Sequence, residues 1–303
     1  MTLEYQTTEY DQNKSVKDIL KKQFQISNRL MTKLKLNQKI FVDNQVAWVN
    51  HIPPLGSLIK VIVDFEEEDN TIPQEGDLKI LYEDEYFLAV NKPAHLVVHP
   101  CSYHPDHTLA NYVKYYLNNK RKIRPINRLD NGTSGIVLFA KNEYIQEQFK
   151  SVNVNAEKEY LVITYGLFQE KKGTIDLPIA RKAESLIERE VNFELGQKSV
   201  THYEVIKEAV WEGKEVSLLK VILETGRTHQ IRVHMSYTGH PLLGDTLYGK
   251  EVEGENKVFT SQALHAYKLS FIHPITKKNI TISASFPDNI EDFLKEIFKL
   301  KEI

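Results

Sequence analysis

The chain has 303 residues, of which 41% are hydrophobic, so it is long enough to bury a substantial core and does not belong to the disordered or fibrous classes. Its longest apolar runs, such as residues 135–140, are far shorter than the roughly 18 residues of a membrane-spanning helix. The first residues lack a secretory signal pattern, and a single cysteine excludes an internal disulfide, so we expect a cytoplasmic protein with no membrane association.

The net charge of −2 hides an uneven distribution along the chain. Residues 1–62 carry nine Lys and Arg against five Asp and Glu, residues 64–85 carry one against ten, and residues 86–303 carry 29 against 26. Proteins that bind nucleic acid usually carry a basic excess. Such an excess is concentrated in the N-terminal part of this chain.

The N-terminal part predicts two helices followed by a small sheet. Residues 1–12 are polar and are expected to be loose. Ser15 is a predicted helix cap, because apolar residues follow it at spacings of three and four. A second helix is predicted at residues 27–36, and strands are predicted within residues 39–49 and at residues 57–63.

Basic side chains crowd this N-terminal unit, mostly on its two predicted helices. They are Lys17, Lys21, Lys22, Arg29, Lys33, Lys35 and Lys39. Taken alone, such crowding most often marks a solvated helical face, and RNA binding is the alternative.

An acidic stretch at residues 64–85 separates this unit from the rest of the chain. Its Pro73 and Gly76 are typical of a connector. The pattern favours a solvated linker over an acidic docking segment.

The remainder of the chain predicts an α+β fold with a mixed, mostly antiparallel sheet. Strands are predicted at residues 86–93, 135–141, 159–166, 199–206, 215–223, 265–271 and 279–286, and helices at residues 108–119, 142–152 and 289–300. We find no internal repeat. No heptad pattern is sustained, so the oligomeric state stays open, with a monomer as the expectation.

Three polar segments stand out in this larger region. In the first, residues 125–135, the Asn131-Gly132 pair predicts a tight turn directly after Asp130. A lone Asp at a turn usually only accepts backbone N–H groups. Arg128, two residues earlier, favours a functional role instead.

The second segment comprises residues 224–234 and 239–245. Thr228 is the predicted cap of a short helix that ends near Gly239 and carries His229 and Arg232 on one face. A guanidinium directed at a carboxylate would hold it ionised and in place. A metal site formed by three histidines is a weak alternative, because their spacing is not that of a zinc motif and no thiolate or carboxylate completes the set. These histidines are His229, His234 and His240.

The third segment is the strand at residues 158–166, in which Tyr160 shares a face with Lys158, Val162 and Thr164. A tyrosine in a strand usually packs in the core. Without its context, Tyr160 would therefore be interpreted as a packing residue.

Together these segments resemble the RluA-type family of RNA pseudouridine synthases. RLDNGTSGIVLFAK at residues 128–141 is similar to the family's signature around its catalytic aspartate, KEYLVITYG at 158–166 to its second motif, and GRTHQIRVH with GHPLLGD at 226–245 to its third. Flanking blocks extend the resemblance over residues 78–287. The N-terminal unit resembles the alpha-L RNA-binding module of many members that act on large-subunit ribosomal RNA.

The resemblance implies an isomerase that converts uridine to pseudouridine in RNA, most often in large-subunit ribosomal RNA, without a cofactor or a metal. It also implies an alpha-L module at residues 13–63, an acidic linker at 64–77 and a catalytic domain at 78–303. Transfer RNA is the alternative substrate.

Carried over position by position, the resemblance makes Asp130 the catalytic carboxylate, Tyr160 the tyrosine that lies against the uracil, and Arg232 the partner of Asp130. Arg128 would occupy the space left by the displaced base. The family most often has His where this chain has Asn127. We expect this difference to change the local RNA contact or the orientation of the loop, and not the chemistry. The implied RNA contacts are Arg128, Asn127, Arg227, His229, Lys17, Lys21, Lys22, Arg29 and Lys33.

Two other functions remain open at this point. The first is a non-catalytic RNA-binding or ribosome-assembly factor that keeps the synthase fold, and Asn127 is its only support. The second is a hydrolase that uses Asp130 and Arg232 to cleave a glycosidic bond.

Overall fold

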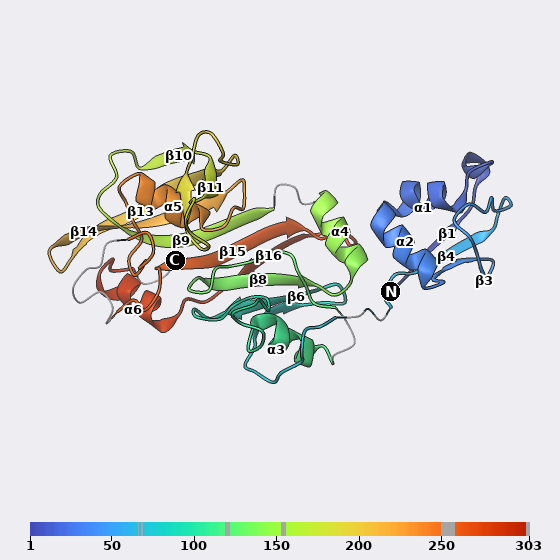
Figure 1. The fold of residues 1–303 in the computed structure, drawn as a ribbon, viewed down its shortest axis with the longest axis horizontal. Coiled ribbons are helices and arrows are strands. Elements are labelled where there is room, and N and C mark those ends of the chain that lie inside the picture. Colours follow the sequence, from blue (N-terminus) through green and yellow to red (C-terminus); the bar gives the residue numbers. More distant parts are fainter. Residues whose placement is uncertain (66, 68, 119–121, 153–155, 250–257, 301–303) are drawn as a thin grey trace.

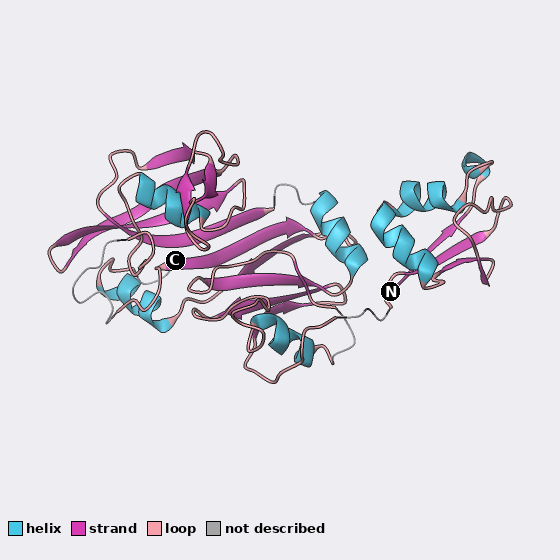
Figure 2. Cartoon of the chain, viewed as in Figure 1, coloured by secondary structure: helices cyan, strands magenta, loops and turns pink. Residues whose placement is uncertain are grey.

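The structure is a computed structural model that describes residues 1–65, 67, 69–118, 122–152, 156–249 and 258–300. It contains a small N-terminal unit and a larger region built on one long sheet (Figures 1 and 2). Glu66 and Glu68 of the acidic stretch, and Asn119 at the end of a predicted helix, lie outside the described residues. No helix of the described residues is long and apolar enough to cross a membrane.

The N-terminal unit packs two helices on a four-stranded antiparallel sheet. Its elements are β1 (Thr2–Gln6), the short 3-10 helix η1 (Glu9–Asp11), α1 (Val16–Phe24), α2 (Asn28–Leu36), β2 (Ile40–Val42), β3 (Gln45–Val46) and β4 (Leu58–Ile62). Both helices begin after a serine whose hydroxyl accepts a backbone N–H, from Asp18 for Ser15 and from Leu30 for Ser27. The helix pair and the small sheet predicted from the sequence are confirmed.

The expectation of loose residues at the start of the chain was wrong, because β1 pairs with β4 along its whole length. This edge strand only partly buries its alternate side chains, Leu3 and Tyr5. With so few apolar residues, its pattern is too weak to identify a strand from the sequence.

The acidic stretch is not simply a solvated linker, so that interpretation was also wrong. Glu67 accepts hydrogen bonds from Arg124 at 2.5 and 2.6 Å, and Asp69 accepts one from Lys114 at 2.9 Å. All four side chains are largely buried. The stretch is therefore tied to the larger region by ion pairs.

The larger region is built on a ten-stranded sheet with the main strand order β10-β13-β14-β9-β15-β8-β6-β5. Its strands are β5 (Lys79–Glu83), β6 (Phe87–Lys92), β7 (Arg124–Pro125), β8 (Ser134–Ala140), β9 (Glu157–Tyr165), β10 (Lys172–Asp176), β13 (Val200–Trp211), β14 (Lys214–Leu223), β15 (Leu264–Ile272) and β16 (Asn279–Ser283). A separate hairpin consists of β11 (Ile179–Arg181) and β12 (Arg189–Val191), and the helices are α3 (Leu109–Tyr116), α4 (Glu143–Val152), α5 (Gln230–Tyr237) and α6 (Asp288–Glu296).

The pairing is antiparallel except between β8 and β15, which confirms a mixed, mostly antiparallel sheet in an α+β fold. Gly135 lies where these two parallel strands meet, with φ of +111°. A Cβ there would come within 2.3 Å of the Ala266 carbonyl oxygen, so only glycine fits. The strands missed from the sequence, including β7 and β10 to β12, are short and mostly polar.

Side-chain alternation along the strands separates two apolar layers. Leu88 and Val90 of β6 pack with α3 and α5, whereas Phe87 and Ala89 pack with α4. α6 packs with Leu161 and the other side chains of β9 that point away from Tyr160. α3 and α5 therefore cover one face of the sheet, and α4 and α6 cover the other. Tyr160 belongs to the face of α3 and α5.

Candidate active site

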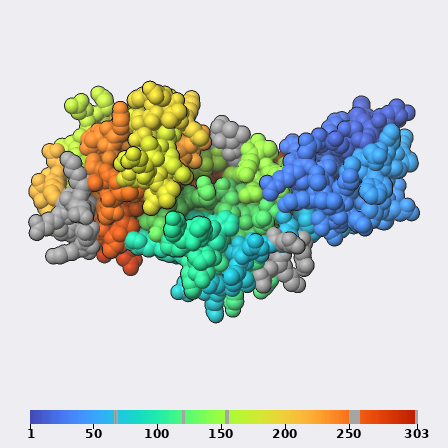
Figure 3. All heavy atoms as spheres, in the orientation of Figure 1, coloured from blue at the N-terminus to red at the C-terminus, as the bar shows by residue number. Residues whose placement is uncertain are grey.

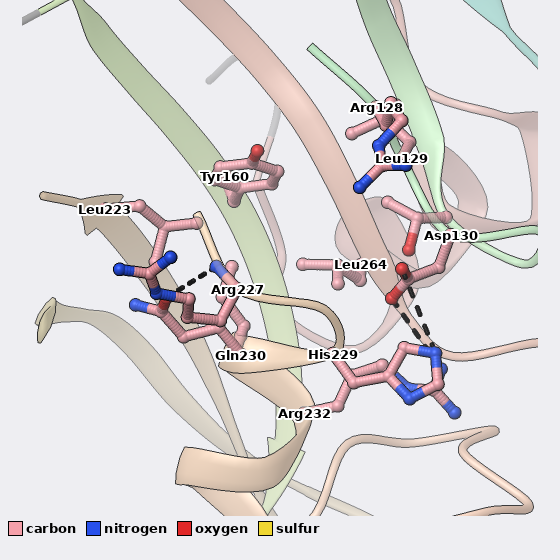
Figure 4. Close-up of a pocket in the computed structure, with 12 residues that line it drawn as sticks. Arg128, Leu129, Asp130, Tyr160, Leu223, Arg227, His229, Gln230, Arg232 and Leu264 are labelled. Atoms are coloured by element: carbon pink, nitrogen blue, oxygen red, sulfur yellow. Dashed lines mark hydrogen bonds and ion pairs between the residues drawn. The ribbon is translucent and has the colours of Figure 1, made fainter. Parts of the chain in front are cut away.

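Asp130 lies in the loop between β7 and β8, on a turn that the sequence predicted correctly. Its carbonyl oxygen accepts the Thr133 N–H at 3.1 Å, which closes the turn over Asn131 and Gly132. A Cβ at Gly132 would come within 2.4 Å of the Gln262 side chain, so the turn packs tightly on that neighbour. The Asp130 side chain remains 25% exposed. The loop therefore presents this carboxylate to a pocket (Figure 4).

Asn127 holds the start of this loop against β8. Its amide N–H donates to the Ile136 carbonyl at 2.9 Å, and its carbonyl oxygen accepts the Leu138 N–H at 2.9 Å. The side chain thus pairs with the β8 backbone as a neighbouring strand would. The predicted RNA contact of Asn127 stays a prediction, but these two bonds give the residue a role in positioning the loop.

Lys92, at the end of β6, supports the same loop from within the protein. Its side chain is fully buried and donates to three carbonyl oxygens, those of Pro93, Leu96 and Asn131, at 2.7 to 3.0 Å. Burial lowers the pKa of Lys92 to about 7, although nearby Asp130 opposes the shift. This role of Lys92 was not predicted from the sequence, although the residue lies in the strand predicted at residues 86–93.

The opposite wall of the pocket is the start of α5. The predicted cap at Thr228 was wrong by one residue: His229 is the N-cap, in a left-handed conformation with φ of 58°. The turn before it is held by Gln230, whose side-chain oxygen accepts the Arg227 N–H and the Thr225 hydroxyl. A glutamine that caps the turn ahead of its own helix has no simple sequence signature.

Arg232 makes its strongest contacts with Asp245, a residue to which the sequence analysis gave no role. Its Nε and Nη2 donate to the two carboxylate oxygens of Asp245 at 2.7 Å each. Burial alone would lower the pKa of Arg232, but the bonds to Asp245 outweigh burial and raise it. The expected pairing with Asp130 is present and longer, at 3.7 Å from Nη1 to Oδ2. The role of Asp245 could have been suspected from the sequence, because the residue ends the GHPLLGD segment that resembles a family motif.

Tyr160 on β9 forms a flat wall between these two sides (Figure 4). Only 7% of the residue is exposed. Burial, reinforced by the negative charge of Asp130, raises the pKa of the Tyr160 phenol well above its usual value. The phenol therefore stays protonated at neutral pH.

Arg128 and Arg227 lie at the exposed rim of the pocket. Arg227 donates from Nε to the Lys198 carbonyl at 3.3 Å. Arg128 makes no hydrogen bond or ion pair with any residue in the described part of the chain. Its guanidinium is therefore available to a ligand.

The structure brings six of the predicted site residues around one pocket, and these are Arg128, Asp130, Tyr160, Arg227, His229 and Arg232. The predicted basic residues of α1 and α2 lie in the N-terminal unit, at the other end of the molecule (Figure 1). Lys17, Lys21 and Lys22 are exposed there. Arg29 and Lys33 contact Glu143 at the start of α4. α2 therefore uses part of its charge to contact the larger region, and the two units touch in the space-filling view (Figure 3).

The three histidines considered for a metal face different partners. His229 contacts Tyr248, His234 contacts Thr201, and His240 stacks on Phe168 at 3.9 Å between ring centroids. Across the described ranges, no group of three or more His, Cys, Asp or Glu side chains is arranged to hold a metal ion.

Comparisons with known proteins agree on one family. The model of the RNA pseudouridylate synthase family matches residues 86–237. The uncharacterized RNA pseudouridine synthase YhcT of Bacillus subtilis (strain 168) is 37% identical over 286 residues, which cover 89% of this chain and 92% of that protein. The ribosomal large subunit pseudouridine synthase D of Zymomonas mobilis is 38% identical over 74% of each chain. The solved structure of human RNA pseudouridylate synthase domain containing 1 aligns with a TM-score of 0.58 and 27% identity, over 74% of this chain and 87% of that one.

Proposed function

This chain belongs to the RluA-type family of RNA pseudouridine synthases, and we propose that it isomerises specific uridines in large-subunit ribosomal RNA with Asp130 as the catalytic carboxylate. The family makes the chain an isomerase that acts on RNA. The substrate proposal is supported by relatives named for the large ribosomal subunit. Ribosomal RNA as substrate also supports the cytoplasm as the place of action.

The reaction needs few groups. The bond from ribose to the base nitrogen breaks, the uracil turns, and ribose is joined to a ring carbon. Nothing is oxidised and no group is lost, so the reaction itself requires no cofactor. A carboxylate suits the first step, because it can attack the sugar, stabilise developing positive charge, or remove a proton from the neighbouring carbon.

The observation that carries the proposal is the position of Asp130. Its carboxylate faces the open pocket, with the guanidinium of Arg232 3.7 Å away on one oxygen and the imidazole of His229 3.9 Å away on the other. Asp245 holds Arg232 by two hydrogen bonds, so the positive charge stays beside Asp130. Tyr160 supplies a flat surface against which a detached pyrimidine would be retained.

The target base must leave the RNA stack before it reaches Asp130, which costs a few kcal/mol. We propose that Arg128 offsets part of this cost by inserting where the base was, through stacking and phosphate contacts. Its exposed position at the pocket rim supports this role. For Tyr160 we propose the role of a wall rather than a base, because its raised pKa leaves almost no phenolate at neutral pH to accept a proton.

We further propose that the N-terminal unit is an RNA-binding module, which β1 extends beyond the predicted residues 13–63, and that 78–303 is the catalytic domain, with 64–77 as a connector that ion pairs hold against it. Three exposed lysines on α1 support this division of labour. They are Lys17, Lys21 and Lys22.

The test is the substitution Asp130→Asn, which keeps the shape of the side chain and removes its charge. We expect turnover to fall by about 10⁴-fold or more, with RNA affinity and unfolding temperature unchanged. Pseudouridine would be mapped in ribosomal RNA treated with each protein, and Asp292→Asn, an exposed aspartate on α6, serves as the matched control. Turnover by Asp130→Asn within tenfold of the unsubstituted protein would remove Asp130 from the mechanism.

The same assay distinguishes the other functions. Release of free uracil would identify a hydrolase, since a synthase retains the base. No pseudouridine in any ribosomal RNA at enzyme excess would favour a non-catalytic binding role. Modification of transfer RNA alone would keep the activity and change the substrate.

A further inference from the structure

Tyr248 lies next to both of the groups that approach Asp130, yet it is outside the pocket lining. Its hydroxyl is 2.8 Å from Nδ1 of His229, and its ring lies 5.0 Å from the guanidinium carbon of Arg232. His229 and Arg232 in turn approach different oxygens of the Asp130 carboxylate. One tyrosine thus contacts both neighbours of the predicted catalytic group.

The position of Tyr248 is fixed by its backbone. Its N–H donates to Oδ1 of Asp245 at 3.1 Å, and its carbonyl accepts the Ser236 hydroxyl of α5 at 2.7 Å. The same Asp245 carboxylate accepts both hydrogen bonds from Arg232. Arg232 is therefore held between this carboxylate and the Tyr248 ring, which leaves Nη1 directed at Asp130.

The hydrogen bonds of the phenol favour one tautomer of His229. The Tyr248 oxygen accepts the backbone N–H of Arg189 at 2.8 Å, so its own O–H is free to donate, and Nδ1 of His229 is the acceptor within reach. A neutral imidazole that accepts at Nδ1 carries its proton on Nε2. Nε2 is the nitrogen that faces Asp130. His229 therefore presents an N–H group to the carboxylate.

The electrostatic surroundings keep this imidazole neutral. Burial lowers the pKa of His229; Asp130 opposes this shift, and the positive charges of Arg232 and Arg189 reinforce it. The pKa of the Tyr248 phenol is raised by its burial, so the hydroxyl keeps its proton. The His229 imidazole is thus neutral and the Tyr248 phenol is protonated, as a hydrogen bond from the phenol to Nδ1 requires.

We propose that Tyr248 is a positioning residue, which fixes the Nε2–H tautomer of His229 and the orientation of Arg232 so that each directs an N–H group toward Asp130. At 3.7 and 3.9 Å both donors are just beyond hydrogen-bond distance, so the carboxylate remains free to react while its orientation is guided. Without the hydroxyl, His229 adopts either tautomer, and one of them directs a lone pair at the carboxylate. The effect on turnover rests on the proposed pseudouridine synthesis, but the tautomer does not.

A double-mutant cycle tests the catalytic part. Tyr248→Phe keeps the ring and removes the hydroxyl, and we expect kcat to fall about 10-fold to 100-fold with KM for RNA unchanged. His229→Leu should lower kcat at least as much, and the double variant should be no worse than His229→Leu alone. Additive losses would show that the hydroxyl acts independently of His229 and would overturn the proposal. Tyr82→Phe, which removes a phenol bonded to Asp84 away from the pocket, is the matched control.

Nitrogen NMR of protein labelled at histidine tests the tautomer without any RNA. The His229 signals are identified by their absence in His229→Leu. We expect a protonated Nε2 in the unsubstituted protein and a mixture of tautomers in Tyr248→Phe. A protonated Nδ1 in the unsubstituted protein would refute the proposal, even if Tyr248→Phe did not fold. The expected NMR result in a protein that makes no pseudouridine would instead contradict the proposed function alone.

Discussion

The surroundings of the pocket and the N-terminal unit both carry basic side chains, but they hold these charges in different ways. Arg232 in the pocket wall and Lys92 behind the Asp130 loop are buried and donate to defined acceptors, the Asp245 carboxylate and three backbone carbonyls. On the N-terminal unit, Lys17, Lys21 and Lys22 are exposed, and their side chains make no hydrogen bond or ion pair with the described residues. The effect of a charge in the pocket therefore depends on where its atoms lie. The effect of the basic face of α1 depends only on how many charges it carries.

This difference follows from the dielectric environment. A charge in a largely buried pocket is weakly screened, so a shift of an ångström changes its effect on a neighbour. An exposed lysine acts on phosphates through a screened field, and one such charge can replace another. Substitutions in the pocket should therefore change turnover, and substitutions on α1 should change affinity and its dependence on salt.

Among the residues that support the pocket rather than act in it, the largest effect is expected from Asp245→Asn. This change leaves the buried Arg232 guanidinium without its carboxylate, and loss of one partner of a buried ion pair costs about 3 to 5 kcal/mol of the free energy of unfolding. With Arg232 no longer held, we expect turnover to fall about 100-fold or more. Chemical denaturation and single-turnover assays would measure the two effects. Unchanged turnover in a folded variant would mean that Arg232 needs no support from Asp245.

A smaller effect is expected from Lys92→Met. This change leaves three carbonyl oxygens without a donor, at a cost of about 1 to 3 kcal/mol in the free energy of unfolding. Because one of these carbonyls belongs to Asn131, turnover should fall about tenfold as the loop of Asp130 loosens. Lys79→Met, at a more exposed lysine on β5, is the control. A normal rate with normal stability would contradict the role of Lys92.

The lowered pKa of Lys92 also predicts a pH dependence. Between pH 7 and about 10, the unfolded chain keeps the lysine proton and the folded protein loses it. Stability should therefore rise with pH across this window in the unsubstituted protein, and rise less in Lys92→Met. Denaturation midpoints of both proteins from pH 7 to 10 would measure this. Parallel curves would show that Lys92 keeps its proton when folded.

On the N-terminal unit, we expect the triple change Lys17→Gln, Lys21→Gln and Lys22→Gln to weaken RNA binding without slowing turnover at saturating RNA. If all three lysines contact phosphates, the slope of log affinity against log salt should fall by about 2 to 3. Binding measured at several salt concentrations would test this. A lower saturated turnover would show instead that α1 positions the RNA.

The smallest effect compares two lysines of the same unit. Lys33 already pairs with Glu67 at 2.9 Å and with Glu143, whereas Lys21 is exposed. Lys33→Gln should therefore reduce RNA affinity less than Lys21→Gln, and reduce stability more. Affinity and denaturation measurements on both variants would check this. The opposite ranking would show that Lys33 leaves its carboxylates to bind RNA.

The sequence was sufficient for much of the fold because the patterns involved are local. The helices of the N-terminal unit follow from Ser15, Ser27 and the apolar spacing behind them. The long strands β8, β9 and β14 follow from their β-branched and aromatic residues. β1 and the short strands were missed because a half-exposed edge strand needs few apolar residues and is defined mainly by its partner.

The amino-acid sequence by itself determined the chemical groups of the pocket: the turn that presents Asp130, the strand that carries Tyr160 and the basic segment of Arg232. Only the tertiary structure decided which groups meet. It placed Asp245 and Tyr248 against Arg232, Lys92 beneath the Asp130 loop, and part of the charge of α2 against α4. The physical reason is distance along the chain. Turns and helix caps are made by neighbours in sequence, whereas the partners of a buried charge come from whichever elements the packed sheet brings together.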